Sequence, residues 1–216
     1  MEIGTLIREL GGGMWISAEI FILTLLFSLP LGLVVAFGRM SKIAPVRWIS
    51  KLYISIMRGT PLMLQLMVVY FGPYYLFGMR ISTGYRMTAV LIGFAINYAA
   101  YFAEIYRSGI QEIPKGQHEA AKVLGFNRSQ TFFKIILPQV VKIITPSLGS
   151  ECMTLVKDTS LAHVIGVMEI YVVATNQMAR SRGMIYLVVA GIFYLIMNAI
   201  VSKVFSVIEK RMNYYR

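Results

Sequence analysis

Long apolar segments separated by short polar, mostly basic stretches dominate the chain. Four of them are long and apolar enough to cross a membrane as helices, since roughly 20 residues span a hydrocarbon core of about 30 Å. A fifth segment is weaker, because it contains Lys142 and Glu151. We count it as a span, because omitting it would put two basic segments on opposite sides of the membrane. The predicted spans are residues 14–37, 61–77, 87–105, 139–156 and 184–207.

Composition agrees with this interpretation. Hydrophobic residues make up 57% of the 216-residue chain and charged residues only 14%, whereas soluble domains carry about 25% charged residues. The net charge of +11 would also suit a nucleic-acid-binding protein. The basic residues lie mainly between the spans on one side, however, which is typical of the positive-inside rule. The single cysteine, Cys152, lies in a predicted span and cannot form an intrachain disulfide.

The distribution of Lys and Arg predicts the orientation. Three segments are basic: the connection after the first span, the connection between the third and fourth spans, and the C-terminal tail. With five spans all three lie on one side, which is therefore the cytoplasm, and the N-terminus lies outside. The N-terminal segment lacks a basic n-region and a small-residue cleavage site, so we expect an uncleaved anchor. Without repeats or linkers, residues 1–216 are expected to form one all-α membrane domain.

One apolar stretch, residues 161–174, is too short to span and contains His163 and Glu169. Gly166 divides it, and Thr159 or Ser160 is suited to cap a helix start before it. We predict two short helices near the outer face, between the fourth and fifth spans. Non-spanning backbone at membrane depth must be buried in protein or reached by water, so this stretch is a candidate outer wall or gate.

The loop between the third and fourth spans carries an ordered motif. It consists of Glu119-Ala120-Ala121, then Gly125, then Ile135-Ile136-Leu137-Pro138. Pro114 suits a first helical turn and Gly125 suits the left-handed conformation that ends a helix, so residues 114–124 are predicted to form a helix of roughly 16 Å. The two alanines keep one side thin, and Leu124 helps to supply an apolar end. Such a helix fits a groove in a partner protein; the alternative is an ordinary interfacial loop helix.

Two polar stripes lie on the predicted third and fourth spans. Their members follow the spacing i, i+4, i+7 and i+11, which places each set on one helical face. The stripes are Asn97, Tyr101, Glu104 and Ser108 on the third span, and Ser147, Glu151, Thr154 and Asp158 on the fourth. Ionisable groups inside a membrane cost about 2.5–3.5 kcal/mol each on insertion scales, so they are functional candidates. We interpret the stripes as facing each other across a cavity; the alternatives are helix-packing contacts, ion pairs with basic residues, or a helix cap at Asp158.

Three further motifs make the chain similar to one known family. They are Arg58-Gly59-Thr60-Pro61, the segment from Asn97 to Arg107, and Lys157-Asp158-Thr159-Ser160-Leu161. The Glu119 motif resembles the signature of ABC importer permeases, and the other three resemble the polar amino-acid branch, the histidine/glutamine/arginine permeases. The resemblance covers about residues 15 to 210.

This resemblance implies a five-span half-permease in the inner (cytoplasmic) membrane of a prokaryote. It implies a dimer with an identical or sibling permease, two ABC ATPase subunits, and an extracytoplasmic solute-binding protein that delivers the amino acid. The helix over residues 114–124 would couple to the ATPase. The coupling residues would be Pro114, Glu119, Ala120, Ala121, Leu124 and Gly125.

The chain is expected to be a transport subunit and not an enzyme. It contains no Gly-x-x-x-x-Gly-Lys-Ser/Thr motif, so ATP with Mg²⁺ would bind to the partner ATPase and this chain would bind no cofactor. His118 and His163 are isolated, which argues against a metal site. A membrane channel or enzyme is the alternative class, but a channel would not need the Glu119 helix and an enzyme would need paired catalytic groups.

The carboxylates favour a cationic substrate. If Glu104, Glu151 and Asp158 line the cavity, its charge is negative, and a basic amino acid would pair with them better than a neutral one such as glutamine. An unpaired buried charge is costly, since removing one partner of a buried pair costs about 3–5 kcal/mol. Donors for the substrate carboxylate would be Asn97, Thr154 and the N–H groups of a helix starting at Ser160. Tyr101 completes the predicted substrate-binding set.

Overall fold

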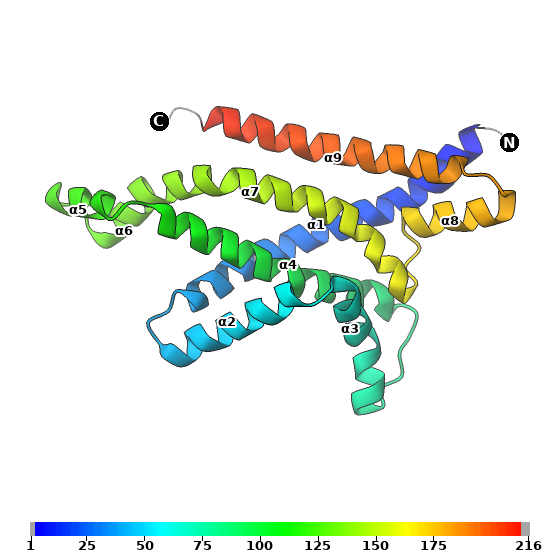
Figure 1. Cartoon of the computed structure of the whole chain (residues 1–216), viewed down its shortest axis with the longest axis horizontal. Coiled ribbons are helices and arrows are strands. Elements are labelled where there is room, and N and C mark those ends of the chain that lie inside the picture. The colour runs from blue at the N-terminus through cyan, green and yellow to red at the C-terminus, as the bar shows by residue number, and fades with distance from the viewer. Residues whose placement is uncertain (1–2, 213–216) are drawn as a thin grey trace.

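The computed structural model describes residues 3–212, and every regular element in this range is a helix (Figure 1). In chain order the elements are α1 (Ile3–Arg39), α2 (Ala44–Gly59), α3 (Leu62–Phe77), α4 (Tyr85–Glu112), α5 (Lys115–Val123), α6 (Arg128–Gln130), η1 (Thr131–Ile136), α7 (Leu137–Asp158), η2 (Thr159–Ile165), α8 (Ile170–Ser181) and α9 (Ile185–Arg211). Figure 1 shows α4, α7 and α9 running along the long axis, with α5 at one end and α8 toward the other.

Within the described residues, four helical runs are long and apolar enough to cross a membrane. They are Ile7–Arg39, Tyr85–Glu112, Arg128–Ile165 and Ile185–Arg211, and they contain the predicted first, third, fourth and fifth spans. The predicted second span corresponds to α3, which forms a pair with α2 bent by 108°. The chain therefore has four candidate spans, or five if the bent pair is one span.

Helix α2 was not predicted; its residues were assigned to a basic connection. Arg47 and Lys51 made this segment look like a loop, yet they are four residues apart and lie on one exposed face of a helix. Ile54 is buried against α1 and α4, with Met57 packed beside it. The segment is thus an amphipathic helix, and the basic residues on its exposed face led to its assignment as a loop.

The break between α2 and α3 follows from Pro61. This residue has no N–H, so the carbonyl of Met57 four residues earlier loses its helical donor. Two side-chain amides replace it: Gln65 Nε2 and Asn97 Nδ2 each donate to the Met57 oxygen at 3.0 Å. Asn97 also donates to Gln65 Oε1 at 2.9 Å. Hydrogen bonds from α3 and α4 therefore satisfy the exposed backbone, as membrane depth requires.

The contact between α1 and α4 is the most extensive helix pair. A Cβ atom added at Gly32 on α1 would lie 2.9 Å from the Cβ of Phe102 and 3.0 Å from the carbonyl oxygen of Ala99 on α4. Small residues allow this approach, and close packing is what holds membrane helices together, because lipid supplies no hydrophobic force between them.

The connection between α7 and α9 contains two short helical elements, η2 and α8, separated by Gly166 at φ +77°. The expected fresh helix start at Ser160 was wrong. Element η2 continues α7 without a gap, and the hydroxyl groups of Thr159 and Ser160 donate backward to the carbonyls of Val156 and Lys157, both at 2.8 Å. No row of free N–H groups therefore begins at Ser160.

We predict that Gly32→Ala destabilises the chain by about 1–3 kcal/mol, because the new methyl group forces α1 away from α4. The matched control is Gly191→Ala, where a Cβ meets nothing within 4 Å and helix propensity favours alanine by up to about 1 kcal/mol. Thermal unfolding of both variants in detergent measures the difference. Equal midpoints for the two variants would contradict the close packing of α1 on α4.

Candidate functional site

The two predicted polar stripes meet between α4 and α7. One hollow of about 280 Å³ is lined by Arg58, Tyr101, Glu104, Ile105, Arg107, Ser108 and Glu151. A second hollow of about 310 Å³ shares Ile105 and Ser108 with it and extends along the helices to Ser147. We call the first one the α4–α7 hollow. It brings together three residues of the predicted substrate set: Tyr101, Glu104 and Glu151.

The sequence did not place Arg58 at this site. The break after Gly59 ends α2 beside α4, so that Arg58 stands in the last turn of α2. Its guanidinium carbon lies 5.2 Å from the centre of the Tyr101 ring, which is a cation–π distance. The only sequence signal for Arg58 is its position directly before the Gly-Thr-Pro break.

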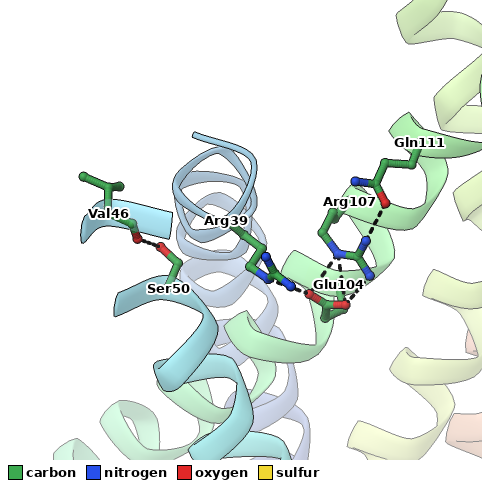
Figure 2. A network of polar contacts seen from close by, with 6 residues as sticks. All are labelled: Arg39, Val46, Ser50, Glu104, Arg107 and Gln111. Atoms are coloured by element: carbon green, nitrogen blue, oxygen red, sulfur yellow. Dashed lines mark hydrogen bonds and ion pairs between the residues drawn. The ribbon is translucent and has the colours of Figure 1, made fainter. Parts of the chain in front are cut away.

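The carboxylate of Glu104 is neutralised by the protein itself. Figure 2 shows it between Arg107 on its own helix and Arg39, which reaches over from α1. Arg107 donates two hydrogen bonds from Nε at 3.0 and 3.1 Å and one from Nη2 at 2.6 Å, while Arg39 Nε lies 3.9 Å from Glu104 Oε1. Arg107 also donates to Gln111 one turn further on. Glu104 is therefore part of a network joining α1 to α4 and is not a free acceptor for a ligand.

Glu151 differs from Glu104. Within residues 3–212 its carboxylate accepts no hydrogen bond and forms no ion pair within 4 Å, although the residue is only partly exposed. A carboxylate held in a hollow without a partner is suited to bind a cationic group of a ligand.

The remaining predicted substrate residues do not line the hollow. Asn97 is buried at the α2–α3 break, and Thr154 is exposed and donates to the carbonyl of Ser150 at 3.2 Å. Asp158 accepts a hydrogen bond from the hydroxyl of Tyr98 at 2.7 Å, and Ser160 bonds back to its own helix. Asn97 and Asp158 thus hold helices together, which was one of the alternative interpretations.

The residues that line the hollow do not carry the net negative charge expected for the cavity. Two carboxylates, Glu104 and Glu151, line it together with two guanidinium groups, Arg58 and Arg107. The formal charges balance, because the sequence argument counted acidic residues inside the spans and not the arginines at their ends.

The predicted helix over residues 114–124 is α5, at the end of the molecule opposite α8 (Figure 1). Pro114 is its N-cap and not its first helical residue, and Gly125 adopts the expected left-handed conformation at φ +77°. Leu124 is 73% exposed, and Glu119 and Ala120 are exposed as well. Ala121 is buried within the chain, so only one of the two alanines faces outward.

The connection from α5 back to the bundle is a turn over residues 124–127, followed by unbroken helix from Arg128 onward. Asn127 and Gln130 form a reciprocal capping box, and η1 follows with a π-type turn in which Leu137 N–H reaches back to the Phe132 carbonyl. Pro138 directly after it lacks an N–H, so a wider turn is a local adjustment to proline. Helical backbone therefore joins Arg128 to α7, and α5 is linked to it through the turn at Gly125.

A buried carboxylate whose role the sequence did not reveal joins α8 to α1 and α9. Glu169 is fully buried and caps α8, accepting from the N–H groups of Tyr171 at 2.8 Å and Val172 at 3.0 Å. The hydroxyl of Tyr194 on α9 donates to it at 3.0 Å, and Ser17 on α1 lies at 3.5 Å. Three helices thus share one carboxylate; the sequence signal was an acidic residue just before a helix.

Comparison with known proteins gives the class of protein. Residues 28–214 match the family described as binding-protein-dependent transport system inner membrane component. The chain belongs to this family of membrane transport subunits. Its curated relatives narrow the assignment: it is a permease subunit of the amino-acid ABC importer type.

Two relatives come from Bacillus subtilis (strain 168). The L-cystine transport system permease protein TcyB is 37% identical over 208 residues, covering 95% of this chain and 87% of the relative. The arginine transport system permease protein ArtQ is 34% identical over 201 residues, covering 93% and 90%. A putative glutamine transport system permease protein from Rickettsia conorii is 32% identical, covering 93% and 91%. The names of these relatives therefore give three different substrates.

Solved structures agree with the family. The crystal structure of an amino acid ABC transporter with histidines has a TM-score of 0.85 and 31% identity, covering 98% of this chain and 99% of that one. A structure of the MetNI methionine ABC transporter matches with a TM-score of 0.75 at 17% identity, covering 98% and 99%; it supports the fold alone.

We predict a pH-dependent stability that arises from Glu169 at the start of α8. Burial raises the pKa of Glu169 above its usual 4.5, although its N–H donors, Tyr194 and His163 act in the opposite direction. Between 4.5 and the raised pKa, the folded chain holds a proton that the unfolded chain has lost, so the free energy of unfolding falls as pH rises. The stability that Glu169 contributes is fully present below pH 4.5, and it is lost as the pH rises through the pKa of Glu169 in the folded chain.

Thermal unfolding in detergent from pH 4.5 upward should show this slope in the parent and not in Glu169→Gln. Glu209→Gln, which changes an exposed carboxylate on α9, is the matched control and should keep the slope. If the parent and Glu169→Gln show the same pH profile, the pKa of Glu169 is the same in the folded and the unfolded chain, and the prediction is wrong.

Proposed function

We propose that this chain forms, together with a second permease subunit, the translocation pathway of a polar amino-acid importer. The observation that carries the proposal is the α4–α7 hollow, where the carboxylate of Glu151, which accepts no hydrogen bond within residues 3–212, and the guanidinium of Arg58 line one small space. These two groups match the two ends of an α-amino acid.

The proposed orientation has five spans, with the bent α2–α3 pair as the second. The N-terminus is then outside, α8 lies at the outer face, and α5 and the C-terminus are cytoplasmic. The basic residues around α2, around α5 and at the end of α9 support it, because they fall together on the cytoplasmic side.

A second permease subunit, identical or sibling, completes the pathway. The α4–α7 hollow is open and measures only about 280 Å³, slightly below the usual range of small-molecule sites, about 300–1,000 Å³. Two such subunits facing each other across an axis along the membrane normal would enclose it, and twofold assemblies are the commonest closed symmetry.

The substrate head group would lie between two opposite charges. Arg58 is suited to bind the α-carboxylate, because a guanidinium donates two parallel hydrogen bonds to a carboxylate. Glu151 would accept from the α-ammonium group. Both side chains line the same hollow, and Tyr101 holds Arg58 from below through its ring.

The balanced charges of the hollow favour an amino acid without net charge, such as glutamine. The basic amino acid predicted from the sequence would bring one more positive charge and would need another carboxylate. Asp158 stands seven residues after Glu151 on the same face of α7 and would supply it, at the cost of its hydrogen bond from Tyr98. Competition by glutamine, arginine and glutamate for uptake distinguishes these two substrates.

Energy would enter through α5. We propose that its exposed surface, including Glu119, Ala120 and Leu124, docks in a groove of an ABC ATPase that binds ATP with Mg²⁺, one ATPase for each permease. Closure of the two ATPases would move α5, and α7 with it, so that the hollow opens outward to receive the amino acid from a solute-binding protein. The site lies in the inner membrane of a prokaryotic cell in this proposal.

Glu151→Gln and Arg58→Gln are each expected to weaken substrate binding. Loss of one charge-assisted hydrogen bond, about 1.5–3 kcal/mol, corresponds to roughly ten- to hundredfold in affinity. Binding of labelled amino acids to the purified permease–ATPase complex, and uptake into proteoliposomes, measure it. Glu209→Gln and Lys203→Gln, which remove the same charges on exposed positions of α9, should bind as the parent does. Normal binding by both hollow variants would refute the proposed site.

Gly125→Val is expected to uncouple the complex. The residue adopts φ +77°, a conformation in which a β-branched side chain is strongly strained, so α5 would change direction. Substrate-stimulated ATP hydrolysis should fall severalfold while the chain still inserts and binds the amino acid. Gly116→Ala, in the first turn of α5 with open space around it, serves as the control. Full stimulation in Gly125→Val would show that this turn does not set the coupling geometry.

A further inference from the structure

A cationic pocket lies where α1 ends and α2 begins. Its volume is about 540 Å³, and its lining consists of Arg39, Ala44, Pro45, Arg47, Trp48 and Lys51. Three of these six residues carry a positive charge and none carries a negative one. The pocket is separate from the α4–α7 hollow in its lining residues.

The cations of this pocket are poorly compensated by the protein. Among the described residues, the Arg47 side chain donates only to the backbone carbonyl of Ser41, at 3.3 Å. Lys51 has no hydrogen bond or ion pair within residues 3–212. Arg39 has one carboxylate, Glu104, at 3.9 Å, and that carboxylate is already bound by Arg107. The pocket therefore has an excess of positive charge and fits an anion.

Apolar side chains continue from the pocket along α2. Trp48 is 64% exposed, Leu52 44% and Ile56 46%, and their spacing of four residues places them on one helical face. Protein does not cover this stripe, which runs from the charged start of α2 toward its break. Charge at one end followed by an apolar stripe matches a ligand that has an anionic head and a long apolar tail.

We propose that the cationic pocket binds the phosphate-bearing headgroup of an anionic phospholipid, whose acyl chain lies along Trp48, Leu52 and Ile56. A guanidinium group can donate two parallel hydrogen bonds to the oxygens of one phosphate. Basic pockets at the cytoplasmic side of membrane helices are suited to lipid headgroups. Trp is enriched at the membrane interface. The proposed orientation assigns this lipid to the cytoplasmic leaflet; binding itself depends only on the pocket. A free phosphate ion would leave the apolar stripe uncovered.

The chain provides its own reporter for this lipid. It has two tryptophans, Trp15 and Trp48, so Trp15→Phe leaves Trp48 as the single fluorophore of the full-length protein. The protein is reconstituted in phosphatidylcholine vesicles that contain either brominated phosphatidylglycerol or brominated phosphatidylcholine as quencher. We expect Trp48 to favour phosphatidylglycerol by about fivefold or more, since one cation near an anionic surface contributes about 1 kcal/mol.

Charge variants separate the pocket from general surface charge. In the same background, Arg47→Gln with Lys51→Gln should lower the preference to about one, and Arg47→Lys, which keeps the charge, should retain most of it. Lys203→Gln with Lys210→Gln removes two exposed cations of α9 that do not line the pocket and should leave it unchanged. Arg39 is not substituted, because it also contacts Glu104.

Three results would overturn the proposal. Equal quenching of Trp48 by the two lipids would show that no anionic headgroup is selected. An equal loss of preference in the α9 control would assign the effect to overall charge. Removal of the preference by inorganic phosphate, at an ionic strength held constant with chloride, would assign the pocket to a soluble phosphate instead. Trp48→Phe, with Trp15 as reporter at the other end of α1, is expected to show no lipid preference.

Discussion

The close approach of α1 and α4 is the contact on which the rest of the molecule depends. In a bilayer, helices gain little from hiding apolar surface from each other, so they associate where small residues let the backbones come together. Gly32 against Ala99 and Phe102 supplies such a contact. With α4 fixed in this way, its other sides hold the remaining helices: Tyr53 of α2 donates to its backbone, and Tyr98 reaches α7 at Asp158. The helices that carry Arg58 and Glu151, α2 and α7, are thus both bonded to α4.

Some charged side chains of this chain take part in two sites at once. Arg39 contacts Glu104 and also lines the pocket at the start of α2, so one guanidinium belongs to both places. Glu104 is held by two arginines, whereas Glu151 lines the hollow and accepts no hydrogen bond within residues 3–212. A ligand in the hollow therefore meets a site whose total charge the protein has already balanced, and recognition depends on where the charges stand rather than on their sum.

The sequence predicted what depends on length and on local backbone chemistry. Apolar runs located four candidate spans, and Gly125 and Gly166 were expected at a helix end and a helix division, where both have positive φ. The predictions failed where the role of a residue depends on a partner that is distant in the sequence. Asn97 was placed on the right span, but its side chain bonds to the backbone at the α2–α3 break. Arg58 lines the hollow because that break ends α2 beside α4. The pairing of Glu104 with Arg107 was readable from their i, i+3 spacing, and overlooking it produced the acidic cavity.

The Met57 carbonyl at the α2–α3 break has a consequence for how transport is powered. In many secondary transporters the unwound carbonyls of a discontinuous helix coordinate a sodium ion or proton, so that an ion gradient drives the solute. Here the Met57 oxygen already accepts two amide donors, and Gln65 also lies 3.1 Å from the Thr60 oxygen. Side chains of the described residues already bind this carbonyl oxygen, so it is not a free ligand for a driving ion. An ion that bound at the Met57 oxygen would first have to displace these two amide donors.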